Sequence, residues 1–114
     1  MTLYLDTDRS RKTGWEGYDY VINRIPAPAG KASVEKYVRT AEPGSFTWES
    51  VGRASLHVRG NTLTLSVPRA LISAEGSLNF EFKWSDNMQE TNVMDFYANG
   101  DAAPIGRFNY LYKE

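Results

Sequence analysis

Short runs of alternating apolar and polar residues follow one another along this chain. In the clearest case two runs flank Gly60-Asn61, and their apolar positions are Ala54, Leu56 and Val58 before the loop and Leu63, Leu65 and Val67 after it. Alternation with a period of two is typical of half-buried β-strands, and a two-residue loop joins them as a β-hairpin. The loop sets the register, which places Val58 opposite Leu63, Leu56 opposite Leu65 and Ala54 opposite Val67.

Further runs of the same kind predict more strands, about eight in all. They cover residues 3–6, 18–24, 34–39, 46–50, 78–85 and 108–112. In the run at 78–85 one face is strongly apolar, and we expect the other face, with Asn79, Glu81, Lys83 and Ser85, to be in water.

The segments between the strands are rich in Gly, Pro, Asn and Asp, which favours an all-β fold. We expect an antiparallel β-sandwich of jelly-roll type rather than alternating strands and helices. Residues 68–72 begin with Pro and predict one helical turn. Residues 86–104 have no clean period, so we expect a long loop there, with a short helix near Val93; loops of that length are often functional.

The 114 residues are enough for a single domain with its own core. The first predicted strand begins at Leu3, so we expect the chain to be excised from a longer one, without the strands that precede this segment. The edge of that first strand would then be open, which predicts a homodimer formed by edge pairing. The alternative is a monomer whose edge is covered by residues 86–104 or by the last strand.

Composition excludes several classes of function. With 13 basic and 14 acidic residues, the net charge of −1 removes the main electrostatic reason to expect nucleic acid as a partner. No apolar run is long enough to span a bilayer, so we expect no membrane insertion. The absence of Cys excludes disulfides and thiolate sites, and His57 is the one histidine, expected at the surface.

Catalytic patterns are also lacking in the sequence. Several carboxylates are available for a glycosidase-type pair, but no spacing selects two of them. We therefore expect no catalytic residues and no enzyme activity, with a small hydrolase as a minor alternative.

A calcium site is suggested by Asp6, Asp8 and Ser10, which offer oxygen donors at alternating positions after a strand. The rest of an EF-type loop is missing, because Arg11 and Gly17 stand where that loop needs Gly and Glu. The alternative is that the two carboxylates accept hydrogen bonds from turn N–H groups and pair with the neighbouring basic residues. If calcium binds, we expect Asp6 and Asp8 to hold it together with loop carbonyls, with Asp19 as a further candidate ligand.

A sugar platform is suggested by the aromatic content, because the apolar faces of pyranose rings pack on aromatic rings while the hydroxyls bond to polar side chains. Trp15 lies in a glycine-flanked loop and is the first candidate, with ordinary core packing as the alternative; Trp48 and Trp84 lie on apolar strand faces and are expected in the core. The remaining candidate ligand-binding residues are Glu16, Tyr18, Asp86 and Asn87.

Several segments in order along the chain resemble a known superfamily. They are Leu5-Asp6-Thr7-Asp8, Thr13-Gly14-Trp15 and Gly17-Tyr18-Asp19-Tyr20, followed by Gly60-Asn61-Thr62-Leu63 and Phe82-Lys83-Trp84-Ser85-Asp86-Asn87. Together they look like DOMON-like domains and family 9 carbohydrate-binding modules, in a version found in bacterial, Bacteroidetes-type polysaccharide-handling proteins. The resemblance implies a β-sandwich without catalysis, a sugar held between aromatic side chains, a structural calcium ion near Asp6 and Asp8, and an extracytoplasmic location.

The sequence therefore predicts a non-catalytic carbohydrate-binding-like module of a secreted or surface bacterial protein, with an oligo- or polysaccharide as its partner. The alternative is a structural or interaction module without a sugar ligand. Burial of the aromatic cluster, with no exposed Trp, would favour that alternative.

Overall fold

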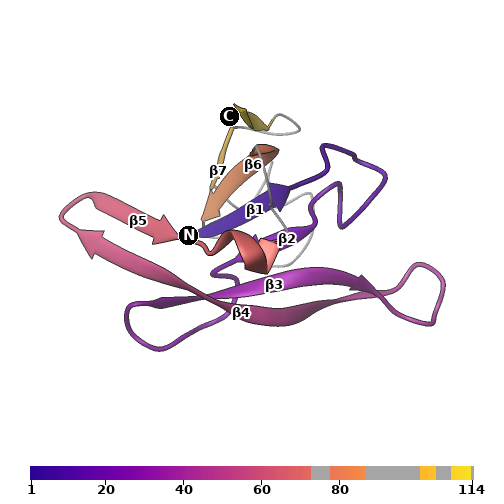
Figure 1. The fold of residues 1–114 in the computed structure, drawn as a ribbon, viewed down its shortest axis with the longest axis horizontal. Coiled ribbons are helices and arrows are strands. Elements are labelled where there is room, and N and C mark those ends of the chain that lie inside the picture. Colours follow the sequence, from indigo (N-terminus) through magenta and orange to yellow (C-terminus); the bar gives the residue numbers. More distant parts are fainter. Residues whose placement is uncertain (73–77, 87–100, 105–108, 114) are drawn as a thin grey trace.

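The computed structural model describes residues 1–72, 78–86, 101–104 and 109–113, and these form one curled antiparallel sheet of eight strands (Figure 1). The sheet order is β5-β4-β3-β2-β1-β6-β7. Strand β8 also pairs with β6, at residues 79–82, whereas β7 pairs with residues 84–86. The strands are β1 (Thr2–Asp6), β2 (Tyr20–Ile22), β3 (Lys31–Arg39), β4 (Phe46–Arg59), β5 (Thr62–Ser66), β6 (Asn79–Asp86), β7 (Asp101–Ala103) and β8 (Tyr110–Lys113), with a four-residue 3-10 helix η1 (Arg69–Ile72) after β5. The prediction of an all-β antiparallel fold and of a helical turn near Pro68 is confirmed.

The predicted hairpin forms in its predicted register. Val58 lies opposite Leu63 and Leu56 opposite Leu65, although the ladder ends at the Ser55–Ser66 pair, so Val67 lies beyond β5. One strand, β4, replaces the two separate runs expected at 46–50 and 53–59, and a bulge at Val51 shifts its pairing with β3. The glycine beside this bulge has a packing reason, because a Cβ at Gly52 would lie 2.8 Å from both terminal methyl groups of Leu71 in η1.

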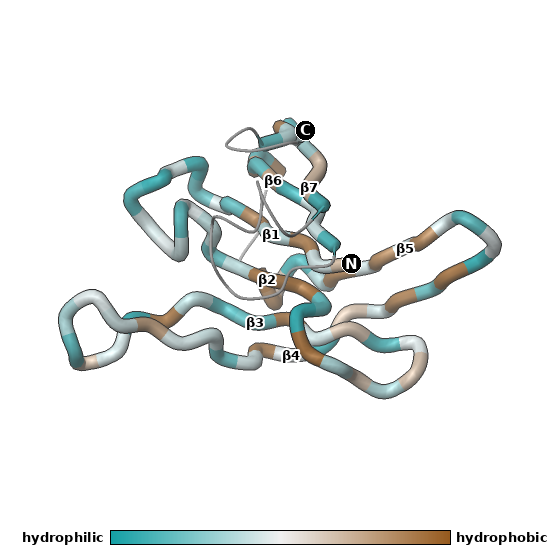
Figure 2. Tube along the Cα trace, turned by 180° about the vertical axis from the view of Figure 1, so that it is seen from behind, coloured by the Kyte–Doolittle hydropathy of each residue, from teal (hydrophilic) through white to brown (hydrophobic). Residues whose placement is uncertain are grey.

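The main core lies on the face of the sheet that carries η1, here called the inner face. Its fully buried residues include Ile22, Ala32 and Val34. Leu65 in β5 and Tyr112 in β8, from opposite ends of the sheet, line the same apolar hollow of about 330 Å³, so the sheet curls toward this face. Figure 2 shows hydrophobic and hydrophilic residues alternating along the β4–β5 hairpin, whereas the loop between β1 and β2 is mainly hydrophilic.

A second, smaller core lies on the opposite, outer face. Residues 7–19 cover that face, and the ring of Trp15 packs 5.7 Å from that of Tyr4, which lies 5.3 Å from that of Tyr18. Neighbouring residues Val21 and Ile22 in β2 are both fully buried, because both faces of this strand are covered. The expectation that the polar face of β6 lies in water is therefore wrong for Lys83 and Ser85, which are 0% and 1% exposed. The Nζ of Lys83 donates to the carbonyl oxygen of Pro104.

The predicted open edge at the first strand is also wrong. Strand β1 pairs with β2 on one side and with β6 on the other, so its backbone groups are already used in the sheet. This removes the reason given for a homodimer at that strand, and the dimer itself stays a prediction. A second sheet facing the first, as a sandwich requires, is not found among the described residues.

The expected long loop at 86–104 begins and ends differently from the prediction. Asp86 is the last residue of β6, and residues 101–103 form β7. The predicted helix near Val93 lies outside the described residues, as does Phe108 at the predicted start of the last strand, which is described from Tyr110.

Candidate functional site

Three aspartates meet where β1 ends and β2 is about to begin. Asp6 is the last residue of β1, Asp8 follows two positions later, and Asp19 returns just before β2; one carboxylate oxygen from each lies within 4.8 Å of the others. Backbone bonds fix Asp19 in place, because its N–H donates to Leu5 (2.8 Å) and its carbonyl accepts from Tyr37 (2.9 Å). The candidate metal-ligating residues of the sequence are thus brought together as one acidic triad, Asp6, Asp8 and Asp19.

A tight turn brings the chain back to Asp19. Trp15 and Tyr18 exchange two backbone hydrogen bonds of 2.9 and 2.8 Å, and Glu16 and Gly17 between them have φ of 52° and 94°. Positive φ at both central residues is the geometry of a type I′ turn. Gly14 just before it also has positive φ, and a Cβ there would overlap the carbonyl oxygen of Tyr18.

Hydrogen bonds from the loop hold the carboxylates of the triad. The Ser10 amide donates to Oδ1 of Asp6 (3.1 Å) and to Oδ1 of Asp8 (3.0 Å). The Thr7 amide donates to Oδ2 of Asp19 (2.9 Å), and the Thr13 hydroxyl donates to Oδ2 of Asp8 (2.6 Å). The prediction that Asp6 and Asp8 accept hydrogen bonds from N–H groups of the turn is therefore confirmed.

The carboxylates were also expected to pair with neighbouring basic residues, but Arg9 pairs with residues of β6 instead. Its Nε lies 3.6 Å from Glu81, and its guanidinium donates to the side chain of Asn79.

Burial and proximity shift the acidity of all three carboxyl groups. Burial, followed by the hydrogen bond with Asp8, raises the pKa of Asp6 to about 7. Burial also raises the pKa of Asp19, although the Thr7 amide opposes the shift. Burial acts on Asp8 as well, but hydrogen bonds from Thr13 and Asp6 outweigh it and lower the pKa of Asp8. The triad therefore holds at least one proton below neutral pH unless a cation replaces it.

The donor chemistry of the triad fits a hard cation. Calcium prefers carboxylate and carbonyl oxygens, and three carboxylates converge here on a loop that also carries exposed backbone. Asp6 is almost fully buried, so its charge needs compensation from a proton or a metal ion. Asp6, Asp8 and Asp19 are the residues that would hold the ion.

The predicted sugar-binding residues do not all lie together. Trp15 is partly buried against Tyr4 and Tyr18, and Glu16 is exposed at the tip of its turn. Tyr18 is in the core, with 4% of its surface exposed and its hydroxyl donating to Asn109 at 2.6 Å.

Asp86 lies at the other end of β1, 3.6 Å from the N-terminal amine of Met1. Asn87 lies outside the described residues. The five residues therefore belong to at least two separate places on the sheet.

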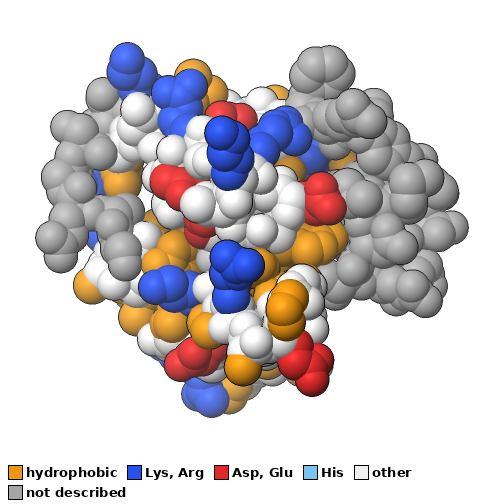
Figure 3. Space-filling view, turned by 90° about the vertical axis from the view of Figure 1, so that its right-hand side faces the viewer, with side chains coloured by type: hydrophobic (Ala, Val, Ile, Leu, Met, Phe, Trp, Pro, Cys, Tyr) orange, Lys and Arg blue, Asp and Glu red, His pale blue; other side chains and the backbone are white. Residues whose placement is uncertain are grey.

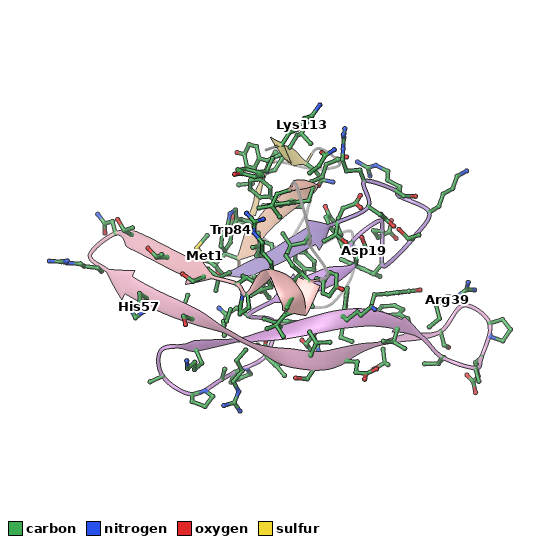
Figure 4. All side chains as sticks on the ribbon, in the orientation of Figure 1. Met1, Asp19, Arg39, His57, Trp84 and Lys113 are labelled. Atoms are coloured by element: carbon green, nitrogen blue, oxygen red, sulfur yellow. The ribbon has the colours of Figure 1, made fainter. Side chains whose placement is uncertain are left out.

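The other predicted placements agree with the structure. Trp84 packs on the main core and Trp48 on the outer-face core, so both are core residues as expected. None of the three Trp residues is exposed, which by the criterion given with the sequence favours the alternative of a structural or interaction module without a sugar ligand. His57 is exposed on the β4–β5 hairpin, far from the triad (Figure 4).

A polar pocket of about 600 Å³ lies between the acidic loop and the tip of the β3–β4 hairpin. Its lining residues are Asp8, Lys12, Thr13, Gly14, Asp19, Tyr37, Arg39, Gly44 and Ser45. Figure 4 labels Asp19 and Arg39 on the same side of the molecule, and Figure 3, which looks at that end, shows basic and acidic side chains next to each other. Two members of the triad thus form one wall of a pocket.

Sequence reasoning missed the far wall of this pocket. Tyr37 stacks on Phe46 with ring centroids 5.0 Å apart, and Trp48 meets both rings edge-on. The signal was present in the alternating aromatic residues of the runs at 34–39 and 46–50, but nothing local connects them with Asp19.

Comparison with known proteins adds no family to this picture. No family model, no curated protein and no solved structure matches the chain. Among the described residues, no helix is long and apolar enough to cross a membrane.

Proposed function

We propose that this chain is a non-catalytic saccharide-binding module whose ligand site is the polar pocket between the acidic loop and the β3–β4 hairpin tip. The observation that carries the proposal is the mixed lining of the pocket. The lining combines the aromatic residue Tyr37 with the polar residues Asp8, Asp19 and Ser45. An aromatic face can accept the apolar side of a pyranose, and the polar groups can bond its hydroxyls.

Calcium bound by the acidic triad would have a structural role in this proposal. The ion would neutralise the carboxylates of Asp6, Asp8 and Asp19, which otherwise share protons. It would also fix the loop that forms one wall of the pocket. The convergence of the three carboxylates and the burial of Asp6 support this assignment.

The resemblance to DOMON-like domains and family 9 carbohydrate-binding modules supports the wider context of the proposal. On that basis the parent protein would be a secreted or surface protein of a bacterium, and the fold would be a β-sandwich. The apolar inner face of the described sheet, with Phe80, Phe82 and Trp84 partly buried, is the surface on which a second layer would pack.

Trp15 and Glu16 do not line the pocket, but in this proposal both contribute at its margin. Both lie directly after Gly14, which lines the pocket. Trp15 would support the loop wall from the protein side through its packing on Tyr4. Glu16, exposed in the turn, would be available to hydroxyls of a longer ligand.

The proposal is tested by titration calorimetry against a panel of soluble oligosaccharides, in buffer with calcium. Tyr37→Ala should weaken binding of any sugar that the wild type takes, because it removes the stacking face. Tyr110→Ala is the matched control, since Tyr110 is an exposed aromatic residue of β8 outside the pocket. Absence of binding across the panel by folded protein would overturn the proposal, as would equal losses in the two variants.

A second candidate function, an interaction module, is favoured by the exposed edge at β8. Tyr110, Leu111 and Tyr112 are each about half exposed on a strand whose described pairing is with β6 alone. Such an edge can pair with another chain, including a second copy. Light scattering over a range of concentrations tests this: Leu111→Lys should abolish a dimer, and a constant monomer mass of 12.9 kDa for the wild type would remove the idea.

A further inference from the structure

Strand β5 lies at one end of the described sheet, where β4 is its only described partner. Its residues, Thr62–Ser66, include neither a charged residue nor a proline, and it pairs with β4 without a bulge. Figure 1 shows the β4–β5 hairpin projecting beyond the other strands. Soluble proteins usually protect a strand edge with Lys, Pro or a bulge, because its free backbone groups can pair with another chain. Strand β8 ends in Lys113, whereas β5 has none of these protections.

The backbone groups that face the free edge of β5 belong to Leu63 and Leu65. On the other side of β4, the N–H of Leu56 donates to the carbonyl oxygen of Gly30 at 3.0 Å, so Leu56 directs its backbone groups away from β5. Leu56 lies opposite Leu65, and this pair is therefore of the non-hydrogen-bonded kind. Because the two kinds of pair alternate along an antiparallel ladder, Leu63 and Leu65 both direct their N–H and C=O groups toward the free edge.

The residue pattern of β5 is self-complementary about its middle residue, Thr64. An antiparallel second copy centred there places Leu63 opposite Leu65 of that copy. It also places Thr62 opposite Ser66, and Thr64 opposite itself. Apolar residues then meet on the inner face, and hydroxyl residues meet on the exposed outer face. The Leu pairs are also those whose free N–H and C=O groups face each other, so side chains and backbone select the same register.

We infer that this chain forms a symmetric homodimer in which the β5 edges of two copies pair antiparallel about Thr64. Both copies use the same strand, so the contact is closed and uses up both β5 edges. The two sheets become one, with a continuous apolar row on the inner face. The row consists of Val58, which is 68% exposed in the single chain, and Leu63, followed by Leu65 and Leu56 of the second copy. The saccharide site is not involved, because its pocket lies at the other end of β4.

Light scattering over a range of concentrations tests the dimer with the full chain. The mass of the wild type should rise from 12.9 kDa to twice that value. Thr64→Lys should remove the dimer, because like charges directly opposite each other repel. Thr64→Glu should also remove it, and an equimolar mixture of the two variants should restore it, since the opposed charges then attract. His57→Lys is the matched control and should dimerise like the wild type, because the exposed His57 lies one strand further in, on β4 (Figure 4).

A cysteine at the centre of β5 tests the register. The chain has no Cys, so Thr64→Cys carries a single thiol. In the proposed dimer Thr64 forms a non-hydrogen-bonded pair with its own copy, and the Cα separation of about 4.5 Å in such pairs allows a disulfide. Thr64→Cys should therefore form a covalent dimer on mild oxidation. Thr62→Cys, which faces Ser66 of the second copy, is the control and should run as a monomer on a denaturing gel.

The outcomes separate this inference from the other proposals. A constant mass of 12.9 kDa for the wild type at all concentrations overturns it. A dimer that persists in Thr64→Lys also overturns it; if Leu111→Lys then removes that dimer, β8 is the interface and the second candidate function is supported instead. Equal cross-linking of Thr64→Cys and Thr62→Cys overturns it as well, because the proposed register requires a difference. None of these results bears on saccharide binding, which is measured separately.

Discussion

Replacing Asp6 with Asn tests the electrostatics of the acidic triad most directly. Asp6 is almost fully buried, and its Oδ1 accepts a hydrogen bond from the Ser10 amide. An asparagine can accept that bond with its own Oδ1 but does not ionise. Asp6→Asn therefore removes the titration and keeps the shape of the loop.

The magnitude follows from the shift in acidity. Burial, followed by the hydrogen bond with Asp8, raises the pKa of Asp6 from 3.8 to about 7. The folded state then holds the proton more tightly than the unfolded chain, so the stability it contributes is complete below 3.8 and is lost as the pH rises through about 7. Between about pH 5 and about pH 8 the metal-free protein should lose about 2 to 3 kcal/mol in free energy of unfolding.

Urea unfolding followed by Trp fluorescence measures this change, in chelator and in millimolar calcium. In chelator the wild type should lose stability toward alkaline pH, and Asp6→Asn should lose much less. Calcium should restore the wild type at about pH 8 by about 2.7 kcal/mol when it reaches about a hundred times its dissociation constant. Asp101→Asn in β7, outside the triad, is the control and should follow the wild type.

Two results would refute the reasoning, each at a different step. Parallel pH profiles for the wild type and Asp6→Asn would mean that Asp6 is not the group that titrates. An unchanged unfolding transition of the wild type in chelator and in calcium would mean that the triad is a hydrogen-bonded turn and not a metal site. The second result would leave the pH prediction standing.

Three further predictions concern stability and are checked by chemical denaturation. Gly52→Ala should cost about 1 to 3 kcal/mol, because its Cβ would lie 2.8 Å from the methyl groups of Leu71; an unchanged midpoint would contradict the packing of η1 on β4. Burial, followed by the charge of a nearby arginine, lowers the pKa of Lys83 to about 8, so wild-type stability should rise between about pH 8 and about pH 10, and Lys83→Met should remove that rise. Arg24→Gln should lower the free energy of unfolding by about 1 to 3 kcal/mol at neutral pH, because it breaks the two hydrogen bonds of 2.8 and 2.7 Å to the buried carboxylate of Glu35. Unchanged stability in that variant would mean that water solvates the carboxylate of Glu35 equally well.

Local features of this protein could be predicted from neighbouring residues alone. The β4–β5 hairpin was predictable because alternation and a two-residue loop are both encoded within about fifteen neighbouring residues. The turn bonds of Asp6 and Asp8 were predictable for the same reason, since the Ser10 amide that binds them lies four and two positions away.

The contacts between segments that are distant in the sequence could not be predicted in this way. Strand β1 pairs with β6, some eighty residues later, and this pairing turns an expected open edge into the interior of the sheet. The same sheet buries Lys83, which the alternation of β6 assigned to water, and the carbonyl oxygen of Pro104, some twenty residues later, accepts a hydrogen bond from its Nζ.

The candidate site combines these two kinds of information. The acidic loop was visible in the sequence, but its pocket depends on Tyr37 and Arg39 in β3, which reach Asp19 through the order of strands in the sheet. Periodicity reports which face of a strand a residue occupies, whereas strand order depends on the free energy of burying whole faces against one another. That energy is summed over the entire sheet, so no local pattern in the sequence contains it.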